Sequence, residues 1–317
     1  MSWWKRIGSL TVAVFTAVVL TATSAAASVP VNSGLPGSAC VSNDGGLTYQ
    51  GPSYGERTNG LGPGAPAYYE IGSPTGAFAG KAAKGLMIVI HGGAWHLVGK
   101  ATVQYERHHA NEWRARGWET INIDYRGCAA SFADVTWFAQ RIRLLNPDAL
   151  ICAEGISAGG QLALMLAATQ SDIACVISLG GPTDFARVAS ETAYDYQTHT
   201  YDTGGPSLVF NWGLAAFGST LSAQSPVNFT SSIGARLLLA SGIGDPLIPA
   251  AQNVDLRNEM FATHSNAYVD VDLLPMGMVQ FVHTGTTQAA LDDLSRREDA
   301  LVAGLSQKPL PPLLSLL

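Results

Sequence analysis

The chain has 317 residues, of which 47% are hydrophobic and only 13% are charged, and it contains 34 glycines. This composition excludes an intrinsically disordered chain and a coiled coil, because both need many more charged residues. The formal net charge of −6 also argues against a nucleic-acid partner, which would require clustered Lys and Arg.

The N-terminal residues 1–27 have the three parts of a secretory signal peptide. Lys5 and Arg6 precede an apolar run over 10–20, and a Ser-Ala-Ala-Ala segment begins at Ser24. The apolar run is shorter than the ~20 residues that a transmembrane helix needs. We therefore expect a secreted or extracytoplasmic protein with no stable membrane insertion after signal cleavage. An uncleaved membrane anchor is the alternative.

The remaining residues, 28–317, alternate apolar strand-like runs with helical segments. Strands are predicted at 85–90, 120–124, 149–153, 173–178, 235–240 and 267–273, and helices at 102–118, 132–145, 157–169 and 286–305. This alternation predicts a single α/β domain, with a mostly parallel sheet that helices cover on both faces.

One connection between strands is much longer than a crossover requires. Residues 184–230 are rich in aromatic side chains and lie between the fourth and fifth predicted strands. We expect this segment to be an insertion that caps one edge of the sheet. The Pro- and Leu-rich tail at 308–317 is assigned no function.

The four cysteines allow three disulfide pairings in an exported protein. Cys40 and Cys128 lie in Gly- and Ser-rich segments and are predicted to form one disulfide. Cys152 and Cys175 lie in apolar runs and are predicted to be buried thiols on neighbouring strands.

The sequence predicts no metal site. No cysteine pair has zinc-binding spacing. His108 and His109 are adjacent in a predicted helix and are expected to face different sides, which disfavours a metal-binding pair.

A Gly-Ile-Ser-Ala-Gly-Gly motif begins at Gly155, directly after a predicted strand and at the start of a predicted helix. The G-x-S-x-G pattern in this position is typical of a nucleophilic serine, because a sharp strand-to-helix turn needs small residues and exposes the hydroxyl. The dipole of the following helix points at the same place. We predict that Ser157 is a nucleophile; a plain glycine-rich helix start is the alternative.

A His-Gly-Gly-Ala-Trp motif occupies 91–95, directly after the first predicted strand. Attack of a serine on a carbonyl carbon creates an oxyanion, which backbone N–H groups can stabilise. The N–H groups of Gly92 and Gly93 are predicted to form this oxyanion hole together with that of Ala158. His91 is expected to brace the loop rather than to transfer protons.

A serine nucleophile needs a base, and the base needs an orienting acid. Asp245 follows the fifth predicted strand and His283 follows the sixth, so both are expected at the edge of the sheet that holds Ser157. His264 is a rival base, but it precedes the sixth strand and is expected at the opposite edge. Trp95, Ile156, Phe210 and Trp212 are predicted to contact substrate.

Together these motifs resemble the α/β-hydrolase superfamily, in its esterase and lipase branch with an HGG oxyanion loop. The resemblance covers about 80–305 and includes an Asp-Tyr-Arg segment at 124–126 and a Ser-Pro-Val-Asn segment at 225–228. It implies a Ser-Asp-His triad and no cofactor. Two residues depart from the family pattern: Ile156, where relatives often carry Asp, Glu or His, and Glu154, where an apolar residue is more usual.

We therefore predict a secreted serine hydrolase, carboxylesterase- or lipase-like, that cleaves a small-molecule, lipid or polymer ester through an acyl-enzyme. An amidase, peptidase or formamidase-like hydrolase could use the same triad. A non-catalytic binding protein on a hydrolase scaffold and a structural role in adhesion are the alternatives from other classes. Acyl and alcohol specificity and the oligomeric state stay open.

Overall fold

The computed structural model describes residues 61, 65–188, 194–195, 200–201, 208–243, 245, 247–264, 266–274 and 288–305. Its strands are β1 (Tyr69–Gly72), β2 (Leu86–Ile90), β3 (Glu119–Ile123), β4 (Ile151–Ile156), β5 (Ile173–Leu179), β6 (Tyr194–Asp195), β7 (Thr200–Tyr201), β8 (Arg236–Gly242) and β9 (Val269–Leu274). Its α-helices are α2 (Lys100–Tyr105), α3 (Arg107–Ala115), α4 (Ser131–Leu145), α5 (Ala158–Thr169), α6 (Phe185–Val188), α7 (Leu208–Phe217), α8 (Ala251–Thr263) and α9 (Gln288–Ala303).

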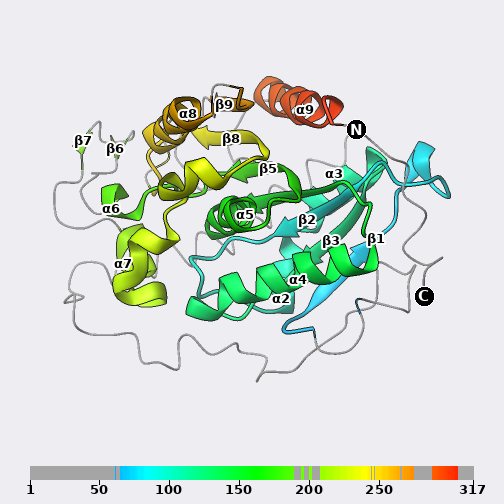
Figure 1. Cartoon of the computed structure of the whole chain (residues 1–317), viewed down its shortest axis with the longest axis horizontal. Coiled ribbons are helices and arrows are strands. Elements are labelled where there is room, and N and C mark those ends of the chain that lie inside the picture. The colour runs from blue at the N-terminus through cyan, green and yellow to red at the C-terminus, as the bar shows by residue number, and fades with distance from the viewer. Residues whose placement is uncertain are drawn as a thin grey trace.

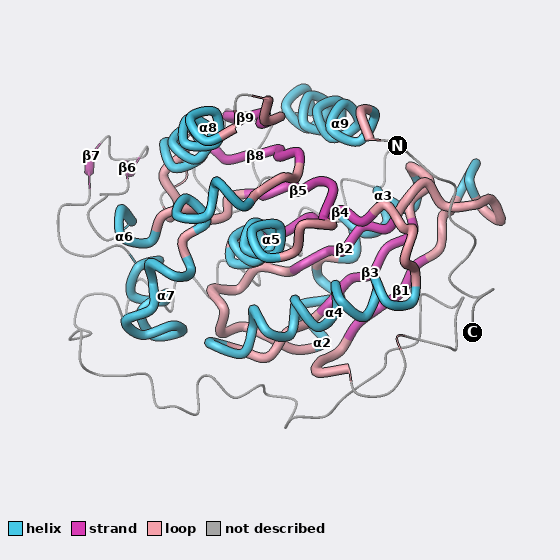
Figure 2. Tube along the Cα trace, in the orientation of Figure 1, coloured by secondary structure: helices cyan, strands magenta, loops and turns pink. Residues whose placement is uncertain are grey.

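Seven of the described strands form one sheet in the order β1-β3-β2-β4-β5-β8-β9. Only β1 is antiparallel to its neighbour, and the other pairs are parallel. The strands lie side by side as the magenta segments of Figure 2. All residues of β2 and β4 are buried, which explains why these strands are continuous apolar runs rather than alternating ones. The predicted, mostly parallel sheet is confirmed.

Helices cover both faces of the sheet, and each face has its own apolar core. One core includes Phe138 of α4, Leu162 of α5 and Leu256 of α8. The other includes Trp113 of α3 and Leu294 of α9. Figure 1 shows α5 between α4 and α8, while α9 lies at the end of the sheet near β9. The two-sided cover predicted from the strand–helix alternation is therefore present.

The segment between β5 and β8 contains α6, α7 and two 3₁₀ helices, at Gly218–Gln224 and Pro226–Ser232. The short β6–β7 ladder belongs to the same segment, and Figure 1 shows these elements together at one end of the molecule. The Trp95 ring of the HGG loop contacts the rings of Phe185 in α6 and Phe217 in α7, with centroids 5.2 and 5.4 Å away. The inserted segment is thus packed against the loop that follows β2.

Two of the differences from the predictions precede β4. The expected helix at 102–118 is two helices, because the backbone of Glu106 (φ −85°, ψ 7°) interrupts it. β1 was not predicted, since its four residues become a strand only by antiparallel pairing with β3. Among the described residues, no helix has the length and apolar character needed to cross a membrane.

Candidate active site

Ser157 lies in the turn that joins β4 to α5. Its backbone has φ 53° and ψ −117°, a positive-φ conformation that is strained for any residue except glycine. The Ser157 N–H donates to Leu179 O at the end of β5, at 2.7 Å. The predicted strand–turn–helix arrangement around Ser157 is therefore present, and the turn is fixed to the neighbouring strand.

The two glycines that flank the turn are required by close backbone contacts. A Cβ atom on Gly155 would collide with the carbonyl oxygen of Gly159, and one on Gly159 would collide with that of Ile90 in β2. The G-x-S-x-G spacing thus lets β4, α5 and β2 meet beneath the serine. This packing explains the small residues, and the strained φ of Ser157 explains how the hydroxyl is presented at the sheet edge.

The HGG loop lies directly against this turn. A Cβ atom on Gly92 would lie 3.2 Å from the Cβ of Ser157 and 3.0 Å from Ile156 O, so any side chain here would crowd the turn. Gly93, Ala94 and Trp95 all have positive φ, at 118°, 52° and 62°. The loop therefore brings backbone groups, rather than side chains, next to Ser157.

The side chain of His91 fixes this loop through contacts with neighbouring residues. Its buried ring stacks on Tyr125, with centroids 4.2 Å apart and planes 13° apart. Nε2 lies 2.9 Å from Asp124 Oδ1 and Nδ1 lies 2.6 Å from Gly92 O. Asp124 Oδ1 also accepts the N–H of Gly99 at 2.9 Å. These contacts fit the predicted bracing role of His91.

Asp245 follows β8, two strands from the nucleophile in the sheet. Its Oδ1 accepts hydrogen bonds from the N–H groups of Leu247 (2.9 Å) and Ile248 (3.0 Å). Burial raises the pKa of Asp245 to about 6, although these two N–H groups oppose the shift. A methyl group on Gly180, which follows β5, would lie 3.6 Å from Asp245 Oδ2.

The end of β5 therefore lies beside both candidate residues. Leu179 accepts the N–H of Ser157, and the adjacent Gly180 approaches the Asp245 carboxylate. Since β4, β5 and β8 are parallel neighbours, their carboxyl ends share one edge of the sheet. His283 lies outside the described residues, so its place in a triad stays a prediction.

His264, the rival base, follows α8 and precedes β9. Its Nε2 lies 3.0 Å from Thr230 O. Because β9 runs parallel to β8, the residues before β9 lie at the edge opposite the one that carries Ser157.

The four residues predicted to contact substrate have different environments. Trp95 is 1% exposed, and its Nε1 donates to Gln161 Oε1 at 2.9 Å. Ile156 is 3% exposed and packs in the core beneath α3 and α9. Phe210 and Trp212 of α7 are half-buried against the other core. Both α7 residues thus retain exposed surface, whereas Trp95 and Ile156 lie almost wholly within packed side chains.

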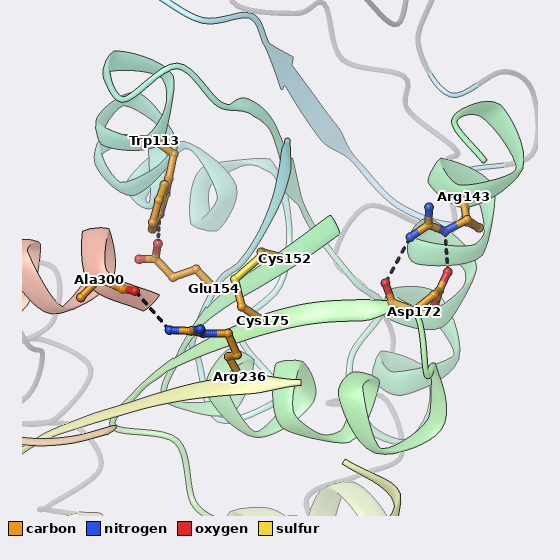
Figure 3. The surroundings of a disulfide bond; sticks show 8 residues. All are labelled: Trp113, Arg143, Cys152, Glu154, Asp172, Cys175, Arg236 and Ala300. Atoms are coloured by element: carbon orange, nitrogen blue, oxygen red, sulfur yellow. Dashed lines mark hydrogen bonds and ion pairs between the residues drawn. A yellow bond between two sulfur atoms is a disulfide. The ribbon is translucent and has the colours of Figure 1, made fainter. Parts of the chain in front are cut away.

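The predicted buried thiols are wrong: Cys152 of β4 and Cys175 of β5 form a disulfide (Figure 3). The register places these two residues directly opposite each other, with Cα atoms 4.7 Å apart, within the range that a disulfide spans. Their neighbouring, buried positions were predicted correctly. Cys128 is disulfide-bonded as well, but Cys40 lies outside the described residues, so the Cys40–Cys128 pairing stays a prediction.

A buried charged cluster that sequence reasoning missed lies two residues after Cys152. The Glu154 carboxylate accepts the Trp113 indole N–H, and its Oε1 lies 2.5 Å from His109 Nδ1 (Figure 3 shows the Trp113 bond). Burial opposes ionisation of Glu154, but the His109 charge and the hydrogen bonds outweigh it and lower the pKa of the carboxyl. Burial likewise disfavours the imidazolium of His109, yet the Glu154 charge raises the pKa of His109 to about 9. The sequence feature that could have indicated this cluster is Glu154 itself, an acid where the family usually has an apolar residue.

The cluster extends to α9. The Arg116 guanidinium lies 2.6 Å from Glu298 Oε2, and its Cζ lies 4.7 Å from the centroid of the Trp113 ring. Burial, together with the Glu154 charge, raises the pKa of Glu298 to about 8. These residues lie on the face of β4 covered by α3 and α9, so they join two helices to the sheet.

The side chains of His108 and His109 do not face different sides of the helix as expected, whereas the prediction that they form no metal site is not tested. Their rings lie side by side in the first turn of α3, with centroids 4.2 Å apart. One ligand atom from each of Glu106, His108 and His109 lies within 4.8 Å of the others.

Comparison with known proteins identifies the family. Residues 78–260, more than half of the chain, match the BD-FAE family model, so the chain belongs to this α/β-hydrolase family. No curated protein matches the chain.

Solved structures share the fold. A truncated carbohydrate esterase from gut microbiota has a TM-score of 0.53 at 19% identity, covering 73% of this chain and 90% of its own. Esterase 2 of Thermogutta terrifontis, phosphonylated by sarin, has a TM-score of 0.58 at 17% identity, covering 76% and 91%. An acylaminoacyl peptidase of Pyrococcus horikoshii has a TM-score of 0.56 at 14% identity, covering 78% of this chain but only 41% of its own.

Proposed function

We propose that this protein is an exported serine esterase that cleaves carboxylic esters through an acyl-enzyme on Ser157. The observation that carries the proposal is the strained Ser157 turn with Gly92 packed against it. A hydroxyl presented on such a turn, beside the side-chain-free backbone of Gly92, suits attack on a carbonyl carbon.

In this proposal His283 takes the proton of the Ser157 hydroxyl as the oxygen attacks the ester carbonyl. The N–H groups of Gly92, Gly93 and Ala158 stabilise the oxyanion that forms. The tetrahedral intermediate then expels the alcohol, which receives the proton from His283. Water repeats the sequence on the acyl-enzyme and releases the acid. Asp245, whose carboxylate is partly buried at the same sheet edge, orients His283 and stabilises its charged form.

Asp245 is suited to that role by its surroundings. Two backbone N–H groups fix Oδ1, which leaves Oδ2 as the oxygen that turns toward the end of β5. A carboxylate held in one orientation can keep an imidazole in one tautomer. This division of the two oxygens supports the choice of Asp245 over the acids that lie within helices or strands.

An ester substrate is favoured because the chain belongs to an α/β-hydrolase family and two of the structural neighbours are esterases, one of them a carbohydrate esterase. An amide substrate is the second candidate because one structural neighbour is an acylaminoacyl peptidase. Amide bonds have poorer leaving groups, so a panel of matched aryl esters, acetylated sugars and anilides would separate the two.

A fluorophosphonate probe tests the proposal directly. The wild-type protein should be labelled once, and Ser157→Ala should not be labelled. Ser131→Ala, which changes a buried serine at the start of α4, is a matched control and should be labelled normally. Unlabelled wild-type protein that is folded and monodisperse would favour a non-catalytic binding protein instead.

A further inference from the structure

Helix α5, which follows the proposed nucleophile, contains one buried polar side chain that the proposed reaction does not use. Gln161 lies one helical turn after Ser157, and its N–H donates to Ser157 O at 3.2 Å. It is fully buried, and every other buried residue of α5 is apolar or glycine. Because a buried amide destabilises the fold unless its polar atoms are hydrogen-bonded, the partners of Gln161 indicate what it does.

Both ends of the Gln161 amide bond to segments outside α5. Its Oε1 accepts the indole N–H of Trp95 at 2.9 Å, and its Nε2 donates to Gln224 O at 2.7 Å. Since an indole N–H only donates and a backbone carbonyl only accepts, these partners allow one orientation of the amide. Trp95 belongs to the HGG loop, and Gln224 ends a 3₁₀ helix of the inserted segment. One side chain of α5 therefore joins both segments to the helix.

Trp95 is the residue through which this bond acts on the HGG loop. Gly93, Ala94 and Trp95 all have positive φ, and strained backbone of this kind persists where surrounding contacts determine it. The carbonyl oxygen of Trp95 accepts the Cys128 N–H at 2.7 Å, while its indole N–H is held by Gln161. Because Trp95 is almost fully buried, its side chain fixes the loop rather than contacting substrate.

The proposed oxyanion hole takes its N–H groups from the two segments that this bond connects. Ala158 is the first residue of α5, three residues before Gln161, and Gly93 lies two residues before Trp95. Such a hole stabilises the transition state only when its donors lie within hydrogen-bond distance of the same oxyanion. Close backbone packing sets how near the glycine loop comes to the nucleophile turn, whereas the directional Gln161–Trp95 bond fixes how the loop is oriented.

We infer that Gln161 is a positioning residue for the oxyanion hole. Acting through Trp95, it holds the N–H groups of the HGG loop in place relative to the N–H of Ala158. Its bond to Gln224 O holds the inserted segment against the same helix. Gln161 is buried and does not touch substrate, and the inference rests on the proposed esterase function. A purely structural role for Gln161 would instead lower stability and leave the turnover of the folded enzyme unchanged.

The test compares Gln161→Met with wild type on a short aryl acetate, under conditions where urea unfolding shows both proteins to be fully folded. Methionine has a similar length and volume but no amide, so it removes both bonds. A donor displaced by about 1 Å should lower kcat about tenfold to a hundredfold. KM should stay close to wild type, because the oxyanion forms only as the reaction proceeds. Gln170→Met, the same substitution at the opposite end of α5, is the matched control and should keep the wild-type kcat.

Trp95→Phe tests the same bond from its other side, and it decides the question alone if Gln161→Met does not fold. It removes the indole N–H but keeps an aromatic ring against Phe185 and Phe217, so kcat should again fall with little change in KM. The double variant should be no slower than Gln161→Met, because both substitutions remove one bond.

A wild-type kcat in either folded single variant, or losses that multiply in the double variant, would overturn the inference. Wild-type protein that neither hydrolyses esters nor reacts with the fluorophosphonate probe would overturn the proposed function, and the inference with it.

Discussion

β4 carries two polar sites that differ in how the protein stabilises them. At its carboxyl end, Ser157 has a strained backbone that contacts Gly92 of the HGG loop and donates to Leu179 O of β5. Three residues earlier, Glu154 is buried and is held by charged and aromatic side chains from α3. Chemistry is proposed at the first site. At the second site the Glu154 carboxylate is paired with His109 and accepts the Trp113 N–H inside the protein, which suits a role in stability.

The comparison predicts that changes at the two sites have opposite consequences. At the edge of the sheet, a substitution should remove activity and leave the fold intact. At the buried Glu154 cluster, a substitution should lower the free energy of unfolding and leave the chemistry of the folded protein intact.

The largest effect is expected for Ser157→Ala. Ester hydrolysis should fall by several powers of ten, leaving only the ~10³–10⁴-fold acceleration over water that the oxyanion hole and binding supply. Alanine is as small as serine, so circular dichroism and the midpoint of urea unfolding should be unchanged. His283→Ala should lose about as much activity, whereas His264→Ala should stay near wild type. An inactive His264→Ala together with an active His283→Ala would show that the base was assigned to the wrong histidine.

The next largest effect is expected for Glu154→Ala, measured as the free energy of unfolding. The substitution leaves the buried His109 without its closest carboxylate and removes the acceptor of the Trp113 N–H. Breaking a buried ion pair in this way costs about 3–5 kcal/mol. The folded fraction should keep its turnover of a short aryl ester.

The matched control for Glu154→Ala is Asp172→Asn, in the exposed ion pair with Arg143 that Figure 3 also draws. An exposed pair contributes less than about 1 kcal/mol, so this variant should unfold close to wild type. Equal costs for the two variants would contradict the assignment of Glu154 to a stabilising cluster. A loss of turnover in folded Glu154→Ala would contradict the division between the two sites.

A smaller effect is expected at Asp245, whose charged carboxylate is proposed to support catalysis but makes the folded protein less stable. Burial raises its pKa to about 6, so the folded protein favours the protonated acid more than the unfolded chain does. This contribution to stability is present below the ordinary pKa of 3.8 and is lost as pH rises through 6. Asp245→Asn should therefore be more stable than wild type at pH 8, by roughly 1–3 kcal/mol, and lose that advantage at pH 4.

Urea unfolding of both proteins at the two pH values measures this difference. Asp148→Asn, on the surface after α4, is the control and should show no pH-dependent gain. Asp245→Asn should also lose ester hydrolysis, because an amide does not stabilise the charged imidazole of the base. A variant that gains no stability at pH 8 would show that the charged Asp245 carboxylate does not destabilise the folded protein at that pH.

The sequence was most informative where local geometry restricts the residue types. The Ser157 turn and the Gly92 approach both exclude larger side chains, so their positions in the fold could be predicted from short motifs. Asp245 could be placed at the correct edge because parallel strands share their carboxyl ends. These inferences need only the order of elements along the chain.

Features that depend on contacts between distant segments could not be predicted. The disulfide between Cys152 and Cys175 requires the register of β4 against β5, in which the two residues are direct partners. The break at Glu106 interrupts a helix that the apolar pattern alone extends, and the approach of the His108 and His109 rings depends on side-chain conformations that the pattern does not specify. Glu154 looked anomalous in sequence, but its partners lie on a separate helix.

The smallest effect is expected in the inserted segment, where Phe210 and Trp212 lie on α7. His96 Nε2 lies 3.3 Å from Trp212 O, so α7 is joined to the HGG loop through its backbone as well as through Trp95. If α7 covers the site and contacts the acyl group, Phe210→Ala should reduce kcat/KM for long-chain aryl esters by a few-fold to tenfold. Each methylene that loses its apolar contact costs up to about 0.8 kcal/mol, whereas acetate, which is too short to reach α7, loses nothing. Kinetics on acetate, butyrate and octanoate esters measure this dependence, and Phe261→Ala, an exposed aromatic on α8, is the control. Equal losses on all three esters would mean that α7 supports the HGG loop without contacting substrate.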